Sequence, residues 1–203
     1  MAVVSIKNKL RRGNLLVGNE AYDPGSFVSI ATATGTGSSD TITFSSIPGT
    51  YQHLQIRFMG KSTDSATNTQ YNYRLRFNSD TGSNYTRHML NGDGSIAQAT
   101  GASSVTEIGP GFTPIPNSGA SLTNMMGVGI IDIHDYTSTS KNKTVRVFTG
   151  TDLNRTTAPT GQVILHSGLW FATPAAITSI NLQLTVGSWT TSSTFALYGI
   201  KGA

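Results

Sequence analysis

The sequence predicts an all-β protein: an antiparallel two-sheet β-sandwich, jelly-roll-like, with an extended N-terminal arm. Hydrophobic and polar residues alternate with a period of two along most of the chain. Turns rich in Gly, Pro, Ser and Asn separate these runs, and no stretch of helical length has a helical period. Charged residues are only 12% of the chain, and hydroxyl and amide residues replace them. Such a composition is typical of β-rich proteins with polar, uncharged outer faces.

The same alternation predicts the individual strands. In "YNYRLRF" (71–77) the aromatic and aliphatic residues fall on one face and the amide and arginine residues on the other. "HLQIRF" (53–58) and "INLQLTV" (180–186) alternate in the same way. Further strands are expected at 27–34, 40–45, 84–90, 127–135, 143–149, 162–171 and 194–201. About ten short strands with turns between them favour a sandwich.

Two segments lack this alternation. Residues 1–26 are irregular and basic, and we predict an arm outside a sandwich domain that spans 27–203. Residues 99–124 hold three prolines and little periodicity, which predicts a long loop that is functional or packs on a neighbour.

Charge is concentrated in the arm. The net charge is +4, and the first twelve residues contain four basic groups and no acid, so the rest of the chain is neutral. A nucleic-acid-binding domain carries a basic face, and a neutral body argues against that partner. No apolar run reaches the roughly 20 residues of a membrane span. The N-terminal segment is not a convincing signal peptide, because basic residues interrupt its short apolar patches.

Reactive and metal-binding groups form no recognisable constellation. Cysteine is absent, which excludes disulfides, thiolate metal sites and thiol nucleophiles. The stretch "NSDTGSNYTRHMLNGDGS" (78–95) fails as a calcium loop, because its third ligand and closing Glu are missing. It fits a turn, a strand and a second turn at "NGDG" (91–94), since Asn-Gly is a strong hairpin signal.

Asp132 and His134 share one face of a predicted strand, with Asp135 beyond them, but no third ligand is evident. No nucleophile elbow, phosphate loop or dinucleotide fingerprint occurs. The sequence therefore predicts no catalytic residues, no metal, no cofactor and no enzymatic activity.

Trp170 and Trp189 lie in "GLWFATP" and "GSWTTSS" and are the candidate glycan-binding residues. Exposed aromatic rings near loops stack on sugars. The alternative is that both rings pack in the core, and we favour it because aromatic side chains bury a large area.

Several segments resemble a group of tailed-bacteriophage virion proteins that includes members from cyanobacterial phages. They are "SSDTITFSSIPGTYQHLQIRF", "RLRFNSDTGSNYTRHMLNGDGS", "SGLWFATPAAITSINLQL" and the ending "STFALYGIKGA", and they cover most of residues 27–203. The resemblance implies a single β-sandwich at the particle surface, described variously as a head-decoration, tail-fibre or baseplate component. It supplies no catalytic motif.

The resemblance and the composition together lead us to expect a virion structural protein. A capsid decoration or cement protein docked by its arm is favoured, because tail fibres are usually long and multi-domain. The alternative is a tail-fibre or baseplate adaptor, or a receptor-binding module for host surface glycans. Expected partners are other capsid or tail proteins and further copies of the chain. The predicted docking residues are Lys7, Lys9, Leu10, Arg11, Arg12, Leu15 and Leu16.

Overall fold

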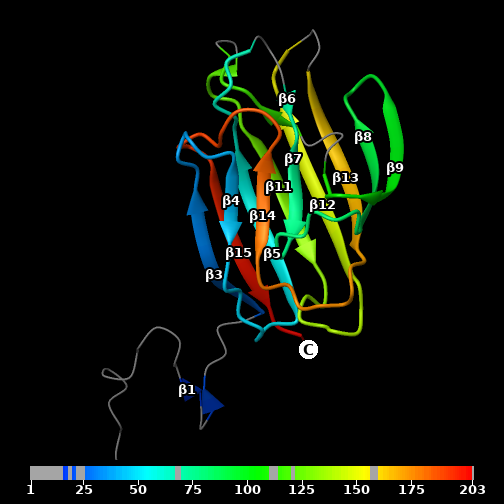
Figure 1. Ribbon diagram of the computed structural model, residues 1–203. Coiled ribbons are helices and arrows are strands. Elements are labelled where there is room, and N and C mark those ends of the chain that lie inside the picture. The colour runs from blue at the N-terminus through cyan, green and yellow to red at the C-terminus, as the bar shows by residue number, and fades with distance from the viewer. Residues whose placement is uncertain are drawn as a thin grey trace, which may run out of the picture.

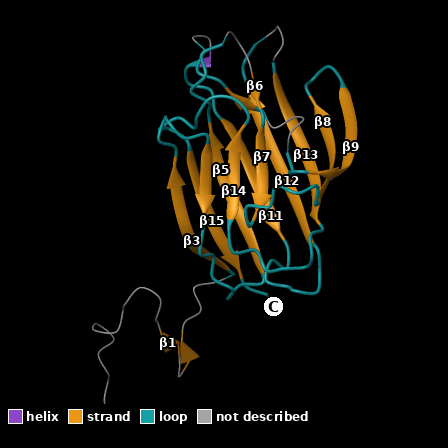
Figure 2. Ribbon diagram, viewed as in Figure 1, coloured by secondary structure: helices purple, strands orange, loops and turns teal. Residues whose placement is uncertain are grey.

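The computed structural model describes residues 26–66, 70–109, 114–119, 122–155 and 160–202, together with the backbone of residues 16–17 and 20–21. Apart from a helical turn at Leu122, the regular structure in these ranges consists of strands (Figure 1, Figure 2). Every pair of neighbouring strands named in these ranges is antiparallel. No described helix is long and apolar enough to cross a membrane. The predicted antiparallel all-β sandwich is confirmed, and the jelly-roll arrangement stays a prediction.

The larger sheet has eight strands. Their order is β3 (Phe27–Thr34), β15 (Thr194–Ile200), β5 (His53–Gly60), β11 (Gly127–Ile133), β12 (Lys143–Asp152), β13 (Gly161–Trp170), β8 (Tyr85–Gly92) and β9 (Ala97–Val105). The smaller sheet has the order β4 (Thr41–Phe44), β14 (Ile180–Leu184) and β7 (Tyr73–Phe77). Two further pairs join β6 (Gln70–Tyr71) to β10 (Ile115–Pro116), and β1 (Leu16–Val17) to β2 (Glu20–Ala21).

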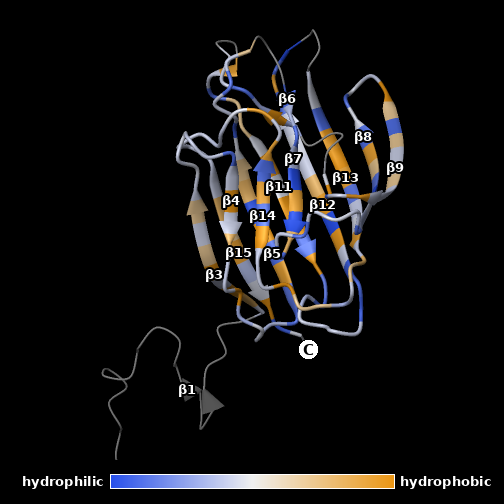
Figure 3. Cartoon of the chain, viewed as in Figure 1, coloured by the Kyte–Doolittle hydropathy of each residue, from blue (hydrophilic) through white to orange (hydrophobic). Residues whose placement is uncertain are grey.

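The smaller sheet covers one face of the larger sheet, and the core lies between them (Figure 1). Buried and more exposed residues alternate along β7, β12 and β14, as the sequence predicts. Figure 3 shows hydrophobic and hydrophilic residues interspersed along the strands. The two sheets contribute aliphatic and aromatic side chains to one continuous cluster. Its members include Leu54, Ile56, Ile131, Ile133, Val145, Val147 and Leu197 from the larger sheet, and Ile42, Phe44, Leu75, Phe77, Ile180 and Leu182 from the smaller sheet.

The predicted long loop at 99–124 is wrong in two places. β9 covers its first residues and pairs with β8, and β10 pairs with β6. The strand sequence "AQATGASSV" is exposed at most positions and has few large apolar residues. The segment is a strand because its backbone hydrogen-bonds to that of β8. β structure here therefore depends more on the neighbouring strand than on the segment's own residues.

A turn follows β8 as predicted for 91–94, but it begins after Gly92 and not at Asn91. Both residues belong to β8, and Asn91 is buried. The chain turns just afterwards, where Asp93 Oδ1 accepts hydrogen bonds from the backbone N–H groups of Ser95 and Ile96, both at 2.9 Å. The carboxylate therefore replaces the Asn-Gly dipeptide as the element that builds the turn.

The predicted turn that begins at Asn78 is confirmed and anchors a buried aromatic cluster. Asn78 and Ser79 have positive φ angles of 50° and 55°, and Asp80 N donates to Phe77 O at 2.9 Å. Two consecutive positive φ angles are typical of a type I′ hairpin turn. The Asp80 carboxylate then accepts hydrogen bonds from Trp170 Nε1 at 2.7 Å and Asn84 Nδ2 at 3.0 Å.

Replacing Asp80 with asparagine is expected to cost about 1–3 kcal/mol of stability at neutral pH. Burial acts to raise the pKa of Asp80, but the hydrogen bonds from Trp170 and Asn84 outweigh it and hold the pKa below its usual range. A lowered folded-state pKa contributes stability above the unfolded-state pKa of about 3.9, and this stability is lost as the pH falls through the folded-state value.

Urea unfolding of the original protein and Asp80→Asn at several pH values measures this contribution. The difference between them should shrink as the pH falls below about 4. A difference that stays constant with pH would contradict the assignment.

Candidate interaction surface

The uncovered face of the larger sheet carries a band of exposed apolar side chains. On β12, core positions alternate with outward positions, and the outward Phe148 is 54% exposed. Neighbouring strands contribute aliphatic side chains with exposed fractions of 36% to 56%. The apolar band, as we call it, consists of Met59, Leu90, Val128, Ile130, Phe148, Val163 and Leu165.

Strand register arranges the apolar band in two rows. In the first row, Phe148 pairs with Ile130 on β11 and with Leu165 on β13, and Leu165 pairs with Leu90 on β8. The second row lies two residues further along the strands, where Val128 pairs with Met59 on β5. Directly paired side chains on one face lie about 4.5–5.5 Å apart at Cβ, so the band is continuous across five strands. Exposed apolar patches of this extent mark interaction sites on soluble proteins.

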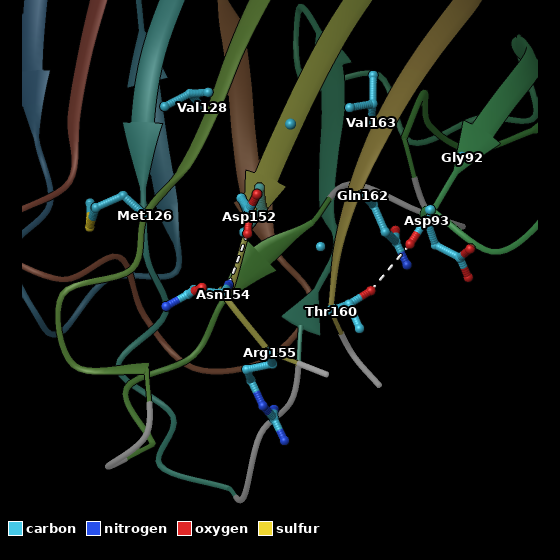
Figure 4. Close-up of a pocket in the computed structure, with 14 residues that line it drawn as sticks. Gly92, Asp93, Met126, Val128, Asp152, Asn154, Arg155, Thr160, Gln162 and Val163 are labelled. Carbon is cyan, nitrogen blue, oxygen red and sulfur yellow. Dashed lines mark hydrogen bonds between the residues drawn. The ribbon is translucent and has the colours of Figure 1, made fainter. Parts of the chain in front are cut away.

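A hollow of about 720 Å³ opens beside the second row (Figure 4). Gly150 on β12 and Gly92 on β8 are among its lining residues, and Figure 4 shows Val128 and Val163 on either side of β12. The far end of the hollow is polar, with Asp93, Asp152, Asn154, Thr160 and Gln162. Asn154 N donates to Asp152 Oδ1 at 2.8 Å, and Thr160 Oγ1 donates to Asp93 O at 3.2 Å.

Two carboxylates, Asp93 and Asp152, and one guanidinium, Arg155, line the hollow. Hydrogen bonds from the backbone N–H groups of Ile96 and Ser95 lower the pKa of Asp93, which keeps this exposed carboxylate ionised. Asp152 is exposed at the end of β12.

A polar row borders the band on the side opposite the hollow. Arg146 on β12 donates to Asp132 Oδ2 at 3.1 Å, and Gln55 Nε2 donates to Asp132 Oδ1 at 2.8 Å. Arg57, which pairs with Ile130 at the β5 end of the first row, donates from Nε to Gln55 Oε1 at 2.8 Å. Its guanidinium lies 5.8 Å from the centre of the Tyr198 ring. The face therefore changes from a polar border that includes the Arg146–Asp132 ion pair, through the apolar band, to a hollow with two carboxylates and one guanidinium.

The two tryptophans lie in the core, as favoured from the sequence. Trp170 is 5% exposed and Trp189 is 0% exposed, so neither ring presents a face on which a sugar could stack. Trp170 Nε1 donates to Asp80, and Trp189 Nε1 donates to Leu182 O at 3.2 Å. Their indole N–H groups are thus used inside the fold, and the glycan interpretation loses the exposure on which it depends.

The other candidates identified from the sequence are structural or lie outside the described residues. His134 and Asp132 point away from the core, but His134 packs its ring against His53 at 4.9 Å while Asp132 binds Arg146. Asp135 binds Lys141 at 2.9 Å. Within the described ranges, no group of three or more His, Asp or Glu residues could hold a metal ion. The side chains of the predicted docking residues, Lys7 to Leu16, lie outside the described residues.

The apolar band is the feature that sequence reasoning missed. The signal was present in "VGIIDI", "VRVFTG" and "VILHSGL", where some outward positions are apolar as well as the inward ones. Only the register of β8, β11, β12 and β13 shows that these outward residues are neighbours.

Comparison with known proteins adds no relative, because no protein-family model, curated protein or solved structure matches the chain significantly.

Proposed function

We propose that the protein is a non-enzymatic structural protein of a phage particle surface, most specifically a capsid decoration or cement protein docked by residues 1–26. The apolar band carries this proposal, because an exposed apolar sheet face is a surface for assembly with other proteins. The resemblance of residues 27–203 to virion proteins supplies the kind of assembly. The basic arm supplies a second attachment element that is separate in sequence from the sandwich.

None of the described carboxyl groups with a shifted pKa is marked as a general acid. A carboxylic acid that acts as a general acid needs a raised pKa. Burial acts to raise the pKa of Asp80 and Glu107, but hydrogen bonds outweigh it and the pKa falls. Hydrogen bonds also lower the pKa of the other shifted carboxyls, Asp40, Asp64, Asp93 and Asp135. These six groups hold turns and ion pairs together and stay ionised.

A second candidate function is a tail-fibre or baseplate module that recognises host glycans. One observation favours it: a hollow of about 200 Å³ lies on the outer face of the smaller sheet, lined by hydroxyl, amide and guanidinium groups. Two of its buried polar atoms, Arg74 Nε and Asn181 Oδ1, have no hydrogen-bond partner among the described residues. Unpaired polar groups of this kind fit the hydroxyl groups of a sugar.

Quantitative mass spectrometry of purified particles tests the first proposal. The protein should copurify in a fixed, high ratio to the major shell protein. A protein that stays in the lysate while complete particles form would refute it.

Competition separates the second candidate from the first. Excess pure protein should leave phage adsorption unchanged if the protein only decorates the capsid. Competition that is abolished by Arg74→Ala, but not by Lys201→Ala at the far end of the chain, would favour the glycan module.

A further inference from the structure

The outward face of β12 is complementary to itself. It presents Arg146, Phe148, Gly150 and Asp152 at successive outward positions. Reflected about the midpoint between Phe148 and Gly150, the large apolar Phe148 corresponds to Gly150, which has no side chain. The basic Arg146 corresponds in the same way to the acidic Asp152.

β8 repeats the size pattern on the same face. Leu90 is 55% exposed, and Gly92 follows two residues later. Because β8 and β12 both flank β13 and both run antiparallel to it, the two glycines lie in the same row. Phe148 and Leu90 therefore occupy one row, and Gly150 and Gly92 occupy the next.

Nothing within the single chain requires these glycines. Neither has a positive φ angle. A Cβ atom at Gly92 meets nothing within 4 Å, and a Cβ atom at Gly150 meets only Gln162 O at an ordinary 3.7 Å. Glycine weakens a strand interior, and its use there often marks a close approach by another backbone or ligand.

We propose that this face packs against the same face of a second copy of the chain. The two-fold axis lies in the interface and crosses the strands between the rows of Phe148 and Gly150. Phe148 then lies over Gly150 of the second copy, and Leu90 lies over Gly92 of the second copy. The large side chains of each row fill the gaps left by the glycines of the other.

Charge follows the same symmetry. The axis that opposes Phe148 to Gly150 also opposes Arg146, which binds Asp132 of its own chain, to Asp152 of the second copy, and symmetry makes this contact twice. In an isologous interface each contact occurs in duplicate about the axis. A second copy related by a two-fold axis can bind this face only if one strand is complementary to itself. An unrelated partner would not need such self-complementarity.

The size of the face is sufficient for such an interface. Five strands about 4.8 Å apart and four rows about 6.8 Å apart project an area of roughly 650 Å². Accessible surface exceeds its projection, and a stable interface of standard size buries about 800 Å² per partner. β12 is central among β5, β11, β12, β13 and β8, so its contacts survive the roughly 30° crossing angle of packed sheets. The contact of Leu90 with Gly92 on β8 requires strands that are more closely aligned.

Sedimentation equilibrium of the full chain tests the proposal, which does not rest on the proposed function. A dimer with a Kd of about 1 μM or tighter is expected. Gly150→Val fills the gap without a clash inside the chain, so it should raise Kd at least about tenfold while thermal unfolding of the monomer is unchanged or improved. Thr144→Val, on the same face of β12 outside the band, is the matched control and should leave Kd unchanged.

Mixing two charge variants tests whether the two-fold axis places Arg146 opposite Asp152 of the second copy. Arg146→Asp and Asp152→Arg should each be monomeric alone, because like charges then face each other. An equimolar mixture should form a heterodimer, since each altered residue meets an opposite charge. A full chain that stays monomeric, a dimer indifferent to Gly150→Val, or a mixture that fails to pair would overturn the proposal.

Discussion

Replacement of Trp189 with alanine is expected to lower the free energy of unfolding by about 3–5 kcal/mol, the largest stability effect of any change considered. The ring is 0% exposed and joins the two sheets. It lies 4.9 Å from the ring of Phe195 on β15 and 6.5 Å from that of Tyr73 on β7. A Cβ atom at Gly60 would lie 2.6 Å from the ring, so only glycine leaves room for the Trp189 side chain at this position of β5. Alanine leaves a cavity that rigid strands on both sides cannot close.

Urea unfolding followed by circular dichroism measures this loss. Val186→Ala is the matched control, because Val186 is 42% exposed, and its cost should be within about 0.5 kcal/mol. A Trp189→Ala protein of unchanged stability that had lost adsorption to host cells would contradict the core assignment and restore the glycan interpretation.

Deletion of residues 2–20 is expected to leave a folded sandwich that no longer joins the particle, with occupancy reduced at least about tenfold. The four basic residues Lys7, Lys9, Arg11 and Arg12 carry charge equal to the whole net charge of the chain. Apolar residues Leu10, Leu15 and Leu16 supply area that can be buried on a partner. Charges at the rim of an interface mainly affect encounter and salt dependence, whereas buried apolar anchors set the lifetime of the complex.

Two variants separate these contributions in a binding assay on purified particles that lack the protein. Changing the four basic residues to serine should weaken binding most at low salt, where screening is least. The deletion should abolish binding at every salt concentration. A truncated protein that still fills all its sites would show that a surface of the sandwich is the docking element.

The sequence predicts well those elements whose own residues determine them. β7 and β14 alternate because one face of each is buried, and this period is visible in "YRLRF" and "INLQL". β9 could not be predicted, because its small residues form a strand only beside β8. The turn predicted at 91–94 begins later than predicted, because the ladder with β13 extends through Asn91 and Gly92 and holds both residues in β8.

The apolar band could not be predicted from the sequence for a similar reason. Leu90, Phe148 and Leu165 are each unremarkable along the chain, since single exposed apolar residues are common. Their significance arises from a register that places residues distant in the sequence in adjacent strands. Outer faces predicted to be polar from composition therefore include one that is apolar.

Imaging of purified particles by electron cryomicroscopy tests the central claim most directly. The account predicts density for the two-sheet sandwich at fixed, symmetric positions on the outer surface of the capsid, with the segment before residue 27 leading to the shell. Density at the tail tip would favour the second candidate function. Complete particles with no sandwich density on either head or tail would contradict the claim that this chain is a structural protein of the virion.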